Sequence, residues 1–366
     1  LVSKRRRVRV IGLMSGTSMD GVDAAVIETD GQKIFDFGPA GVIPYAPKFR
    51  KRLRSIVGRP PDTSAETSNI IRDLTLYHAE AVRAIMRKLE IKGSEVDLIG
   101  FHGQTVYHAP RERVTSQIGD AELLAKKTGI DVVADFRSAD VAAGGEGAPL
   151  APIYHVALCE PLARPVVVLN LGGIGNVSWV NVEDQFLSFD TGPANALIDD
   201  WVLSRTNQPW DHGGQLARSG NVQKPMLDSW LANPYFARQI PKSLDRGEFS
   251  NLLDSLEGVS TEDGAATLTA FTAEAVALAC THFPSPPLRW LVTGGGRRNV
   301  AIMETLTAKL DVPVEPVEVE GWDGDALEAQ AFGFLAARVA FGMPITYPQT
   351  TGVKRPMLGG QMFTLS

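Results

Sequence analysis

Two stretches of the sequence, about 158 residues apart, share one plan: an apolar strand rich in β-branched residues, a loop of Gly and small polar residues, and a second strand. The pieces are Val8–Gly12, Ser15–Gly21 and Val22–Ile27 in the first stretch, and Pro165–Asn170, Gly172–Asn176 and Val177–Val180 in the second. This spacing is nearly half of the 366-residue chain. It predicts a duplicated α/β unit rather than a solenoid, whose period would be roughly 20–50 residues.

The segments between these stretches alternate between the sequence patterns of helices and of strands. Apolar residues recur at helical spacing over Ala65–Glu90, and His78 on that stripe is interpreted as a packed residue rather than a ligand. Two further helices are predicted over Thr267–Thr281 and Asp325–Phe341, the latter starting near Asp323 or Asp325, where a carboxylate suits the positive helix end. Strands are predicted at Val96–Phe101, Ile130–Ala134, Leu288–Thr293 and Phe186–Phe189, the last after a turn at Glu183–Gln185. This alternation predicts α/β layers with largely parallel sheets, and antiparallel pairing where the two loops join strands closely. We expect domains at 1–160 and 161–366.

The charge balance narrows the possible partners. The 36 Lys and Arg against 42 Asp and Glu give a net charge of −6, which argues against nucleic-acid binding by bulk electrostatics. The basic cluster Lys4–Arg7 is interpreted as a solvated terminus. Cys159 and Cys280 are far apart and suit a reducing compartment. The apolar runs are too short for a membrane span or a signal peptide, so we expect a soluble, cytoplasmic protein.

The common nucleotide and metal signatures are missing. There is no G-x-x-x-x-G-K-[ST], no G-x-G-x-x-G after a strand, no H-E-x-x-H and no C-x-x-C. Gly16–Asp20 only approaches the nucleophile elbow, because Asp20 stands where the final Gly should be. Three Gly-rich loops remain, each directly after a strand: Ser15–Gly21, Gly172–Asn176 and Gly294–Asn299.

Loops of this composition suit phosphate binding. Glycine allows backbone N–H groups to approach an anion closely, and successive N–H groups form an anion-binding nest. Thr17, Ser18 and Asn176 add neutral donors, and Asp20 is a candidate Mg²⁺ ligand, directly or through water. One such loop alone is more often a tight hairpin. Three loops, two of them related by the repeat, favour a nucleotide cleft between the two halves.

The segment Gly12–Asp23 resembles the opening motif of the anhydro-N-acetylmuramic acid kinases, which belong to the superfamily of sugar kinases, Hsp70 and actin. The resemblance continues in order along essentially the whole chain. It includes Phe101–Thr105, Ala134–Arg137, Gly144–Leu150, Asn170–Asn176, Phe189–Asn195, Thr293–Asn299 and Asp325–Ala329.

This resemblance implies two duplicated actin-like (RNase H-like) domains with mixed sheets flanked by helices and an active site in the cleft between them. It also implies ATP and Mg²⁺ as cofactors. The expected cofactor-binding residues are Gly16, Thr17, Ser18, Met19, Asp20, Gly21, Val22 and Asp23 in the first phosphate loop, Gly172, Gly173 and Asn176 in the second, and Gly294, Gly295 and Asn299 at the adenosine pocket. Asn170 stands where many superfamily members have Asp, so we expect no metal role there. Ala194 replaces a frequent Gly, which matters only if the backbone needs a positive φ.

Five further residues are candidates for the sugar and its chemistry. A carboxylate at a strand end facing a cleft suits a general base, and the resemblance favours this role for Asp190 over that of a turn cap. His102, Gln104 and Arg137 are implied contacts of the sugar, with Arg137 facing its lactyl carboxylate. Without the resemblance, His102 would be interpreted as a buried, satisfied histidine. Glu328, otherwise an ordinary exposed helical Glu, is the second carboxylate, suited to orienting the sugar or a water molecule.

The implied activity is an ATP-dependent kinase that opens 1,6-anhydro-N-acetylmuramic acid and phosphorylates O6, in cell-wall recycling, with a homodimer expected from the family. Three alternatives stay open at this point. One is a sugar kinase of the same superfold that acts on an ordinary hydroxyl. The others are an ATP-driven chaperone or filament protein, and an ATP-independent glycosidase, which would leave the three Gly-rich loops without a task.

Overall fold

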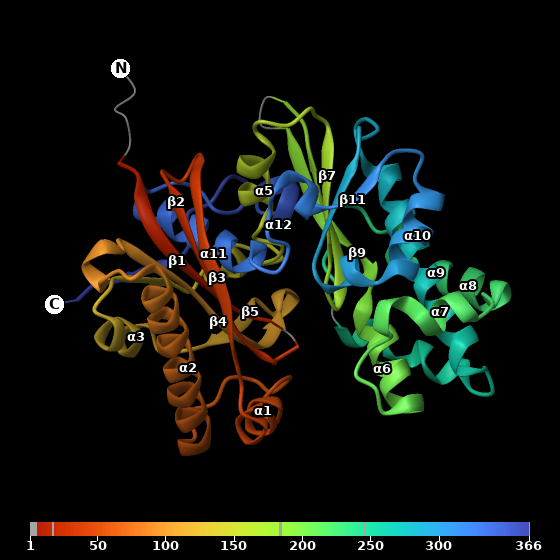
Figure 1. Ribbon diagram of the computed structural model, residues 1–366, viewed down its shortest axis with the longest axis horizontal. Helices are drawn as coiled ribbons and strands as arrows, with labels where there is room; N and C mark the ends of the chain where they lie inside the picture. Colours follow the sequence, from red (N-terminus) through yellow and green to blue (C-terminus); the bar gives the residue numbers. More distant parts are fainter. Residues whose placement is uncertain (1–5, 17, 183–184, 245, 366) are drawn as a thin grey trace. The chain divides into compact units, whose positions relative to one another are not determined.

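The computed structural model describes residues 6–16, 18–182, 185–244 and 246–365, and the chain divides into two compact units (Figure 1). Unit 1 is Leu1–Leu158 together with Ala326–Ser366, and unit 2 is Cys159–Asp325. The expected second domain, 161–366, is therefore wrong in its last part, because residues 326–366 pack with the first unit.

Unit 1 is built on a mixed sheet with the strand order β12-β6-β4-β1-β2-β3, and β5 pairs with β4. Its strands are β1 (Val8–Ser15), β2 (Gly21–Thr29), β3 (Ile34–Pro44), β4 (Leu98–Ala109), β5 (Val114–Ile118), β6 (Val132–Ala134) and β12 (Gln361–Phe363). Its helices are α1 (Pro47–Arg54), α2 (Ala65–Leu89), α3 (Ala121–Thr128), α4 (Ser138–Ala142), α11 (Leu327–Ala340) and α12 (Pro348–Thr351), with α5 (Pro152–Cys159) at the boundary.

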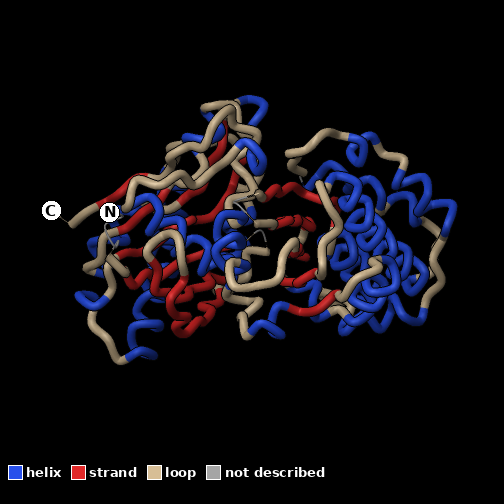
Figure 2. Tube along the Cα trace, turned by 90° about the horizontal axis from the view of Figure 1, so that it is seen from above, coloured by secondary structure: helices blue, strands red, loops and turns tan. Residues whose placement is uncertain are grey.

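Unit 2 has a second mixed sheet, in the order β11-β10-β7-β8-β9. Its strands are β7 (Val166–Leu171), β8 (Ile174–Val180), β9 (Phe186–Pro193), β10 (Trp290–Thr293) and β11 (Val314–Pro316). Its helices are α6 (Asn195–Thr206), α7 (Gln215–Ser219), α8 (Lys224–Leu231), α9 (Thr261–Ala279) and α10 (Val300–Lys309). Figure 2 shows these helices gathered beside the strands of the unit.

The two sheets repeat one topology, which confirms the predicted duplication. In unit 1, β1, β2 and β3 form an antiparallel meander, and β4 and β6 then continue the sheet parallel to β1. In unit 2, β7, β8 and β9 form the meander, and β10 and β11 continue it parallel to β7. The Gly-rich loop joins the first two strands in both units.

The predicted helices are present with shifted ends. The helix predicted over Ala65–Glu90 is α2, and His78 on it is fully buried, with Nδ1 2.8 Å from the Leu74 carbonyl and its ring against Phe101, as expected of a packed residue. Helix α9 begins at Thr261, before the predicted Thr267, because Ser260 caps it. Helix α11 begins at Leu327, two residues after Asp325, and no side chain caps it by a hydrogen bond. Of the predicted turn at 183–185, residues 183 and 184 lie outside the described residues.

Helix α11 lies unusually close to the unit 1 sheet, which explains why the C-terminal segment belongs to unit 1. A Cβ added to Gly12 in β1 would stand 1.7 Å from the Ala329 carbonyl oxygen, and one added to Gly100 in β4 would stand 2.1 Å from the Phe332 carbonyl oxygen. On the helix side, Gly333 faces Gly12. Glycines on both elements thus allow backbone-to-backbone contact along this seam.

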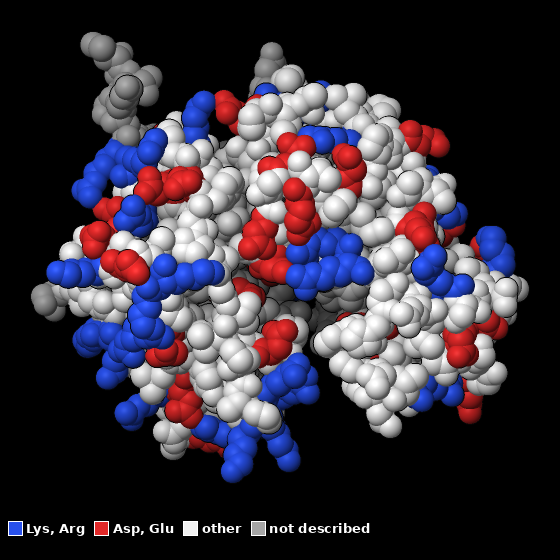
Figure 3. Space-filling model, viewed as in Figure 1, with Lys and Arg blue, Asp and Glu red and all other residues white. Residues whose placement is uncertain are grey.

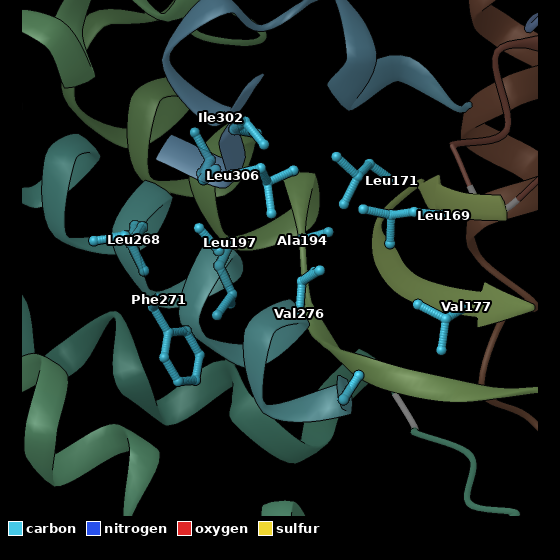
Figure 4. Close-up of a cluster of buried hydrophobic side chains, with 14 of the residues drawn as sticks. Leu169, Leu171, Val177, Ala194, Leu197, Leu268, Phe271, Val276, Ile302 and Leu306 are labelled. Atoms are coloured by element: carbon cyan, nitrogen blue, oxygen red, sulfur yellow. The ribbon is translucent and has the colours of Figure 1, made fainter. Parts of the chain in front are cut away.

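The core of unit 2 is formed by apolar side chains from the sheet and from α6, α9 and α10 (Figure 4). They include Leu169, Val177, Leu197, Leu268, Phe271, Ile302 and Leu306. The segment Thr261–His282 is long and apolar enough to cross a membrane, but 72% of its most apolar 18 residues are buried inside the protein. It therefore serves as a core helix here. On the face shown in Figure 3, acidic and basic side chains are interspersed.

Candidate active site

The first Gly-rich loop joins β1 to β2, and of its predicted residues Thr17 lies outside the described part of the chain. Met19 has a φ of +52°, and its backbone N–H donates to the Gly16 carbonyl (3.1 Å). The Met19 side chain is buried, whereas Ser18 and Asp20 are exposed and joined by a hydrogen bond from Ser18 Oγ to Asp20 Oδ1 (2.8 Å). The loop therefore presents a hydroxyl and a carboxylate to solvent.

The remaining residues of this motif belong to β2. Gly21 packs against the Ile43 carbonyl, and the Val22 side chain is fully buried, so it offers a ligand only its backbone. Asp23 is half-buried and lies opposite Met14. Whether these residues contact a nucleotide stays a prediction.

Three side chains or backbone groups outside the motif hold this loop in place. The Gln104 amide donates to the Gly16 carbonyl (3.2 Å), the Tyr45 backbone N–H donates to the Asp20 carbonyl (2.8 Å), and the Arg50 guanidinium donates to the Ser18 carbonyl (2.9 Å). Tyr45 and Arg50 were missed in the sequence, because they lie on or beside α1 with no local pattern that points to the loop.

Both the oxygen and the nitrogen of the Gln104 amide form hydrogen bonds. Because Nε2 donates to Gly16, Oε1 faces Ser15 and accepts from the Ser15 hydroxyl (2.7 Å). With its one hydrogen used, Ser15 Oγ accepts from the Tyr45 hydroxyl (2.7 Å). Burial raises the pKa of Tyr45, which keeps this hydroxyl neutral and able to donate. The predicted sugar contact Gln104 thus organises the first loop.

His102 and Arg137, both predicted for the sugar pocket, contact each other. Arg137 Nε donates to His102 Nε2 (3.0 Å), so the other ring nitrogen carries the hydrogen and donates to the Gly103 carbonyl (2.9 Å). Burial, together with the Arg137 charge, holds the pKa of His102 well below its usual range. A neutral, buried His102 therefore orients the half-buried Arg137, whose guanidinium also donates to the Gly147 carbonyl (2.6 Å).

Asp140 fixes the loop that carries Gly147 and was also missed in the sequence. Its buried carboxylate accepts from the Gly147 N–H (2.7 Å) and from the Thr351 hydroxyl of α12 (2.6 Å). The Arg137 end of the candidate site is therefore tied to the C-terminal segment. Glu328 lies in the first turn of α11 and is exposed, and its role at the sugar stays a prediction.

The second Gly-rich loop is shorter than predicted, because β8 already begins at Ile174. Only Gly172 and Gly173 connect β7 to β8, and their carbonyls accept from the backbone at the start of α6 (3.0–3.2 Å). Asn176 lies within β8 and is half-buried. Ala194 has a φ of −127°, so its methyl group fits there, as expected.

The third Gly-rich loop lies against the second. Gly294 has a φ of +76°, and a Cβ there would stand 2.4 Å from Asn170 Oδ1. This contact follows from the parallel pairing of β7 and β10, whose carboxyl ends meet at one edge of the sheet. Gly295 is exposed, while Asn299 caps α10 by accepting from the Ile302 N–H (3.2 Å). Arg297 stabilises the loop through the Gly294 carbonyl (3.0 Å) and Asp325 (2.9 Å).

Asp190 lies inside β9, which runs on to Pro193, and not at the end of the strand as predicted. Its side chain is 9% exposed, and Oδ2 accepts from the backbone N–H of Leu244 (2.8 Å), 54 residues along the chain. It is therefore not a local turn cap. Asp190 pairs with Asn176 across the two strands, which places it beside the second loop.

The described residues contain no group of three or more His, Cys, Asp or Glu side chains that could hold a metal ion. Mg²⁺ typically takes one or two carboxylates, water and the phosphates of a nucleotide rather than a cage of protein ligands. The exposed carboxylate of Asp20 suits that kind of site.

Two mixed sheets of one topology, each with a Gly-rich loop between its first two strands, place the chain in the class of duplicated actin-like α/β proteins. The fold is similar to that of the (R)-2-hydroxyglutaryl-CoA dehydratase component A of Acidaminococcus fermentans, with a TM-score of 0.50 and 12% identity over 91% of this chain and 99% of that one.

Sequence comparisons identify one family within this class. A family model of anhydro-N-acetylmuramic acid kinase matches residues 8–364. The anhydro-N-acetylmuramic acid kinases of Paramagnetospirillum magneticum and Rhodospirillum rubrum are 53% and 54% identical to the chain, which covers 98% and 93% of their lengths; both matches cover 96% of this chain. The chain belongs to the anhydro-N-acetylmuramic acid kinase family.

Proposed function

We propose that this chain is an ATP-dependent kinase that opens 1,6-anhydro-N-acetylmuramic acid and phosphorylates O6, giving N-acetylmuramic acid 6-phosphate. The observation that carries the proposal is the match to this family over residues 8–364. Such a reaction belongs to the recycling of peptidoglycan, and its need for ATP fits a cytoplasmic location. We also propose a homodimer, as the family resemblance implies.

The residues present fit a nucleotide with Mg²⁺. A Cβ on Gly16 or Gly172 would meet nothing closer than 3.8 Å or 3.5 Å, so the backbone of both loops is open to a ligand. Gly16–Asp23 and Gly172–Asn176 would hold the phosphates, Gly294–Asn299 would hold the adenosine, and Asp20 would hold Mg²⁺ directly or through water. When bound, ATP with Mg²⁺ supplies the phosphoryl group that O6 accepts, and the metal neutralises charge on the phosphates.

Asp190 is the proposed general base. In the substrate, O6 is tied to C1, so that bond must break before O6 can carry a phosphoryl group. Asp190 takes a proton from a water molecule whose oxygen bonds to C1 from the face opposite O6, as in inverting glycosidases. The C1–O6 bond breaks, and O6 keeps the electron pair. Glu328 would orient the sugar or the water, and Arg137 the lactyl carboxylate. An active site in a cleft between the domains stays a prediction.

The direct test is mass spectrometry of the anhydro sugar after incubation with the protein, Mg²⁺ and ATP. We expect a product heavier than the substrate by both one water and one phosphoryl group. N-Acetylmuramic acid, tested in parallel, should be the poorer substrate. A product that gains a phosphoryl group alone, or a preference for the open sugar, would instead indicate a kinase that acts on an ordinary hydroxyl.

Gln104 provides a second test, because its amide holds the first loop. Gln104→Ala removes the hydrogen bonds to Gly16 and Ser15, each worth about 1 kcal/mol, so we expect KM for ATP to rise about 10-fold or more. KM for the sugar should change much less. Gln117→Ala is the matched control, since the Gln117 amide donates to the hydroxyls of Thr105 (3.3 Å) and Thr115 (2.8 Å) and not to the first loop. A rise confined to KM for the sugar would make Gln104 a sugar contact instead.

A further inference from the structure

A buried lysine lies beside the proposed base in unit 2. The Lys242 side chain is 7% exposed, and its Nζ donates to the backbone carbonyls of Tyr235 (3.1 Å) and Phe236 (3.3 Å). The same amine lies 4.5 Å from the centre of the Tyr235 ring, in cation–π geometry. A lysine is rarely buried this deeply, because its ammonium loses hydration. The burial of Lys242 therefore requires an explanation.

Three hydrogen bonds join Lys242, Tyr235 and Asp190 in a ring. The Tyr235 hydroxyl donates to the Asp190 carbonyl (2.6 Å), the Lys242 amine donates to the Tyr235 carbonyl, and the Asp190 N–H donates to the Lys242 carbonyl (3.0 Å). Two residues further on, the Leu244 N–H donates to the Asp190 carboxylate (2.8 Å). The segment that starts at Lys242 therefore fixes both the backbone and the side chain of Asp190.

We propose that Lys242 is a positioning residue for Asp190: its ammonium anchors the 235–244 segment around the base and places a positive charge near the carboxylate. This inference rests on the proposed role of Asp190 as general base. Small misplacements of reacting groups are costly, since a shift of about 1 Å can reduce a rate roughly 100-fold.

The charge on Lys242 changes within an accessible pH range. Burial and the neighbouring Arg238 lower its pKa to about 8, against the opposing effect of Asp190. Arg238 lies 5.1 Å from the Tyr235 ring and is paired with Glu248. Burial and the charge of Lys242 lower the pKa of His282. Below pH 8 the ammonium is present; above it, the charge beside Asp190 is lost. Turnover of the wild type should therefore fall as the pH rises through about 8.

The test compares the pH profiles of kcat for the wild type, Lys242→Met and Lys242→Arg. We expect Lys242→Met to lower kcat by up to about 100-fold, with little change in KM for ATP and without the decline near pH 8. Lys242→Arg keeps its charge to higher pH, so the decline should move above pH 10. Independently of activity, NMR of ¹³C-labelled lysines should show one resonance, absent in Lys242→Arg, that titrates near pH 8.

Two results would overturn the inference: a decline near pH 8 that persists in both variants, or a lysine resonance of ordinary midpoint near 10.5. If Lys242→Met does not fold, Tyr235→Phe serves in its place. This variant lacks the hydrogen bond from the Tyr235 hydroxyl to the Asp190 carbonyl, so kcat should fall while the decline near pH 8 remains. An unchanged kcat would show that this ring of hydrogen bonds does not position Asp190. An Asp190→Asn variant with near-normal turnover would contradict the proposed role of Asp190 as general base. An inactive Asp190→Asn variant together with an unaltered Lys242→Met profile would contradict only the role of Lys242.

Discussion

Replacing Asp190 with Asn is expected to lower kcat by about 10²–10⁴-fold, the usual contribution of general-base assistance. The amide cannot take a proton from water at neutral pH, but its oxygen can still accept from the Leu244 N–H, so the fold around residue 190 should persist. Steady-state kinetics with the anhydro sugar give kcat, and calorimetric titration with an ATP analogue gives the nucleotide affinity, which should stay nearly constant.

Asp211→Asn is the matched control for this variant. Asp211 is another buried carboxylate of unit 2, and it accepts from the Leu216 and Ala217 N–H groups at the start of α7. Its replacement should lower the stability of unit 2 while kcat changes only a few-fold. Near-normal turnover in Asp190→Asn would show that Asp190 is not the base, and an equal loss in both variants would point to a structural effect.

The Gly12→Ala substitution is expected to destabilise unit 1 by about 3 kcal/mol or more, the upper range for overpacking. The new methyl group would stand 1.7 Å from the Ala329 carbonyl and 2.6 Å from the Gly333 nitrogen, and neither backbone atom can move without displacing α11. For a unit of this size, differential scanning calorimetry should show its melting temperature lowered by about 6–12 °C. Because Glu328 lies in the first turn of α11, KM for the sugar should rise as well.

The control is Gly41→Ala in β3 of the same sheet. A Cβ there would lie 3.8 Å from Ile85 Cδ1, an ordinary contact, and we expect a change within about 0.5 kcal/mol. If Gly12→Ala melts with the wild type, the close seam between β1 and α11 does not exist as described.

Local patterns in the sequence predicted the repeated part of the fold well. The β-branched strands on either side of each Gly-rich loop identified β1 with β2 and β7 with β8, because strand periodicity and turn residues act over short distances. The packing of α11 on β1 was not predicted, since it joins residues more than 300 positions apart. The signal for it was present in Gly12, Gly100 and Gly333, but a glycine inside a strand or helix does not reveal its partner.

The candidate site was likewise predictable from local sequence only in part. The chemistry of Asp190 and of the Gly-rich loops could be inferred from residue type, but the groups that hold them could not. Gln104 was expected at the sugar, yet its amide is used by Ser15 and Gly16. Tyr45 and Lys242 carry no motif that marks them, because their roles come from tertiary hydrogen bonds alone.

Unit 2 is one continuous segment, Cys159–Asp325, inserted into unit 1, which is made of two separated pieces. During synthesis, unit 2 can therefore complete its core while unit 1 still lacks α11 and β12. Until residues 326–366 leave the ribosome, α11 cannot pack on Gly12 of β1 and Gly100 of β4. Folding of unit 1 is therefore completed only after the last tenth of the chain has been synthesised. An excised 159–325 fragment has all of its own core elements, whereas a 1–158 fragment does not.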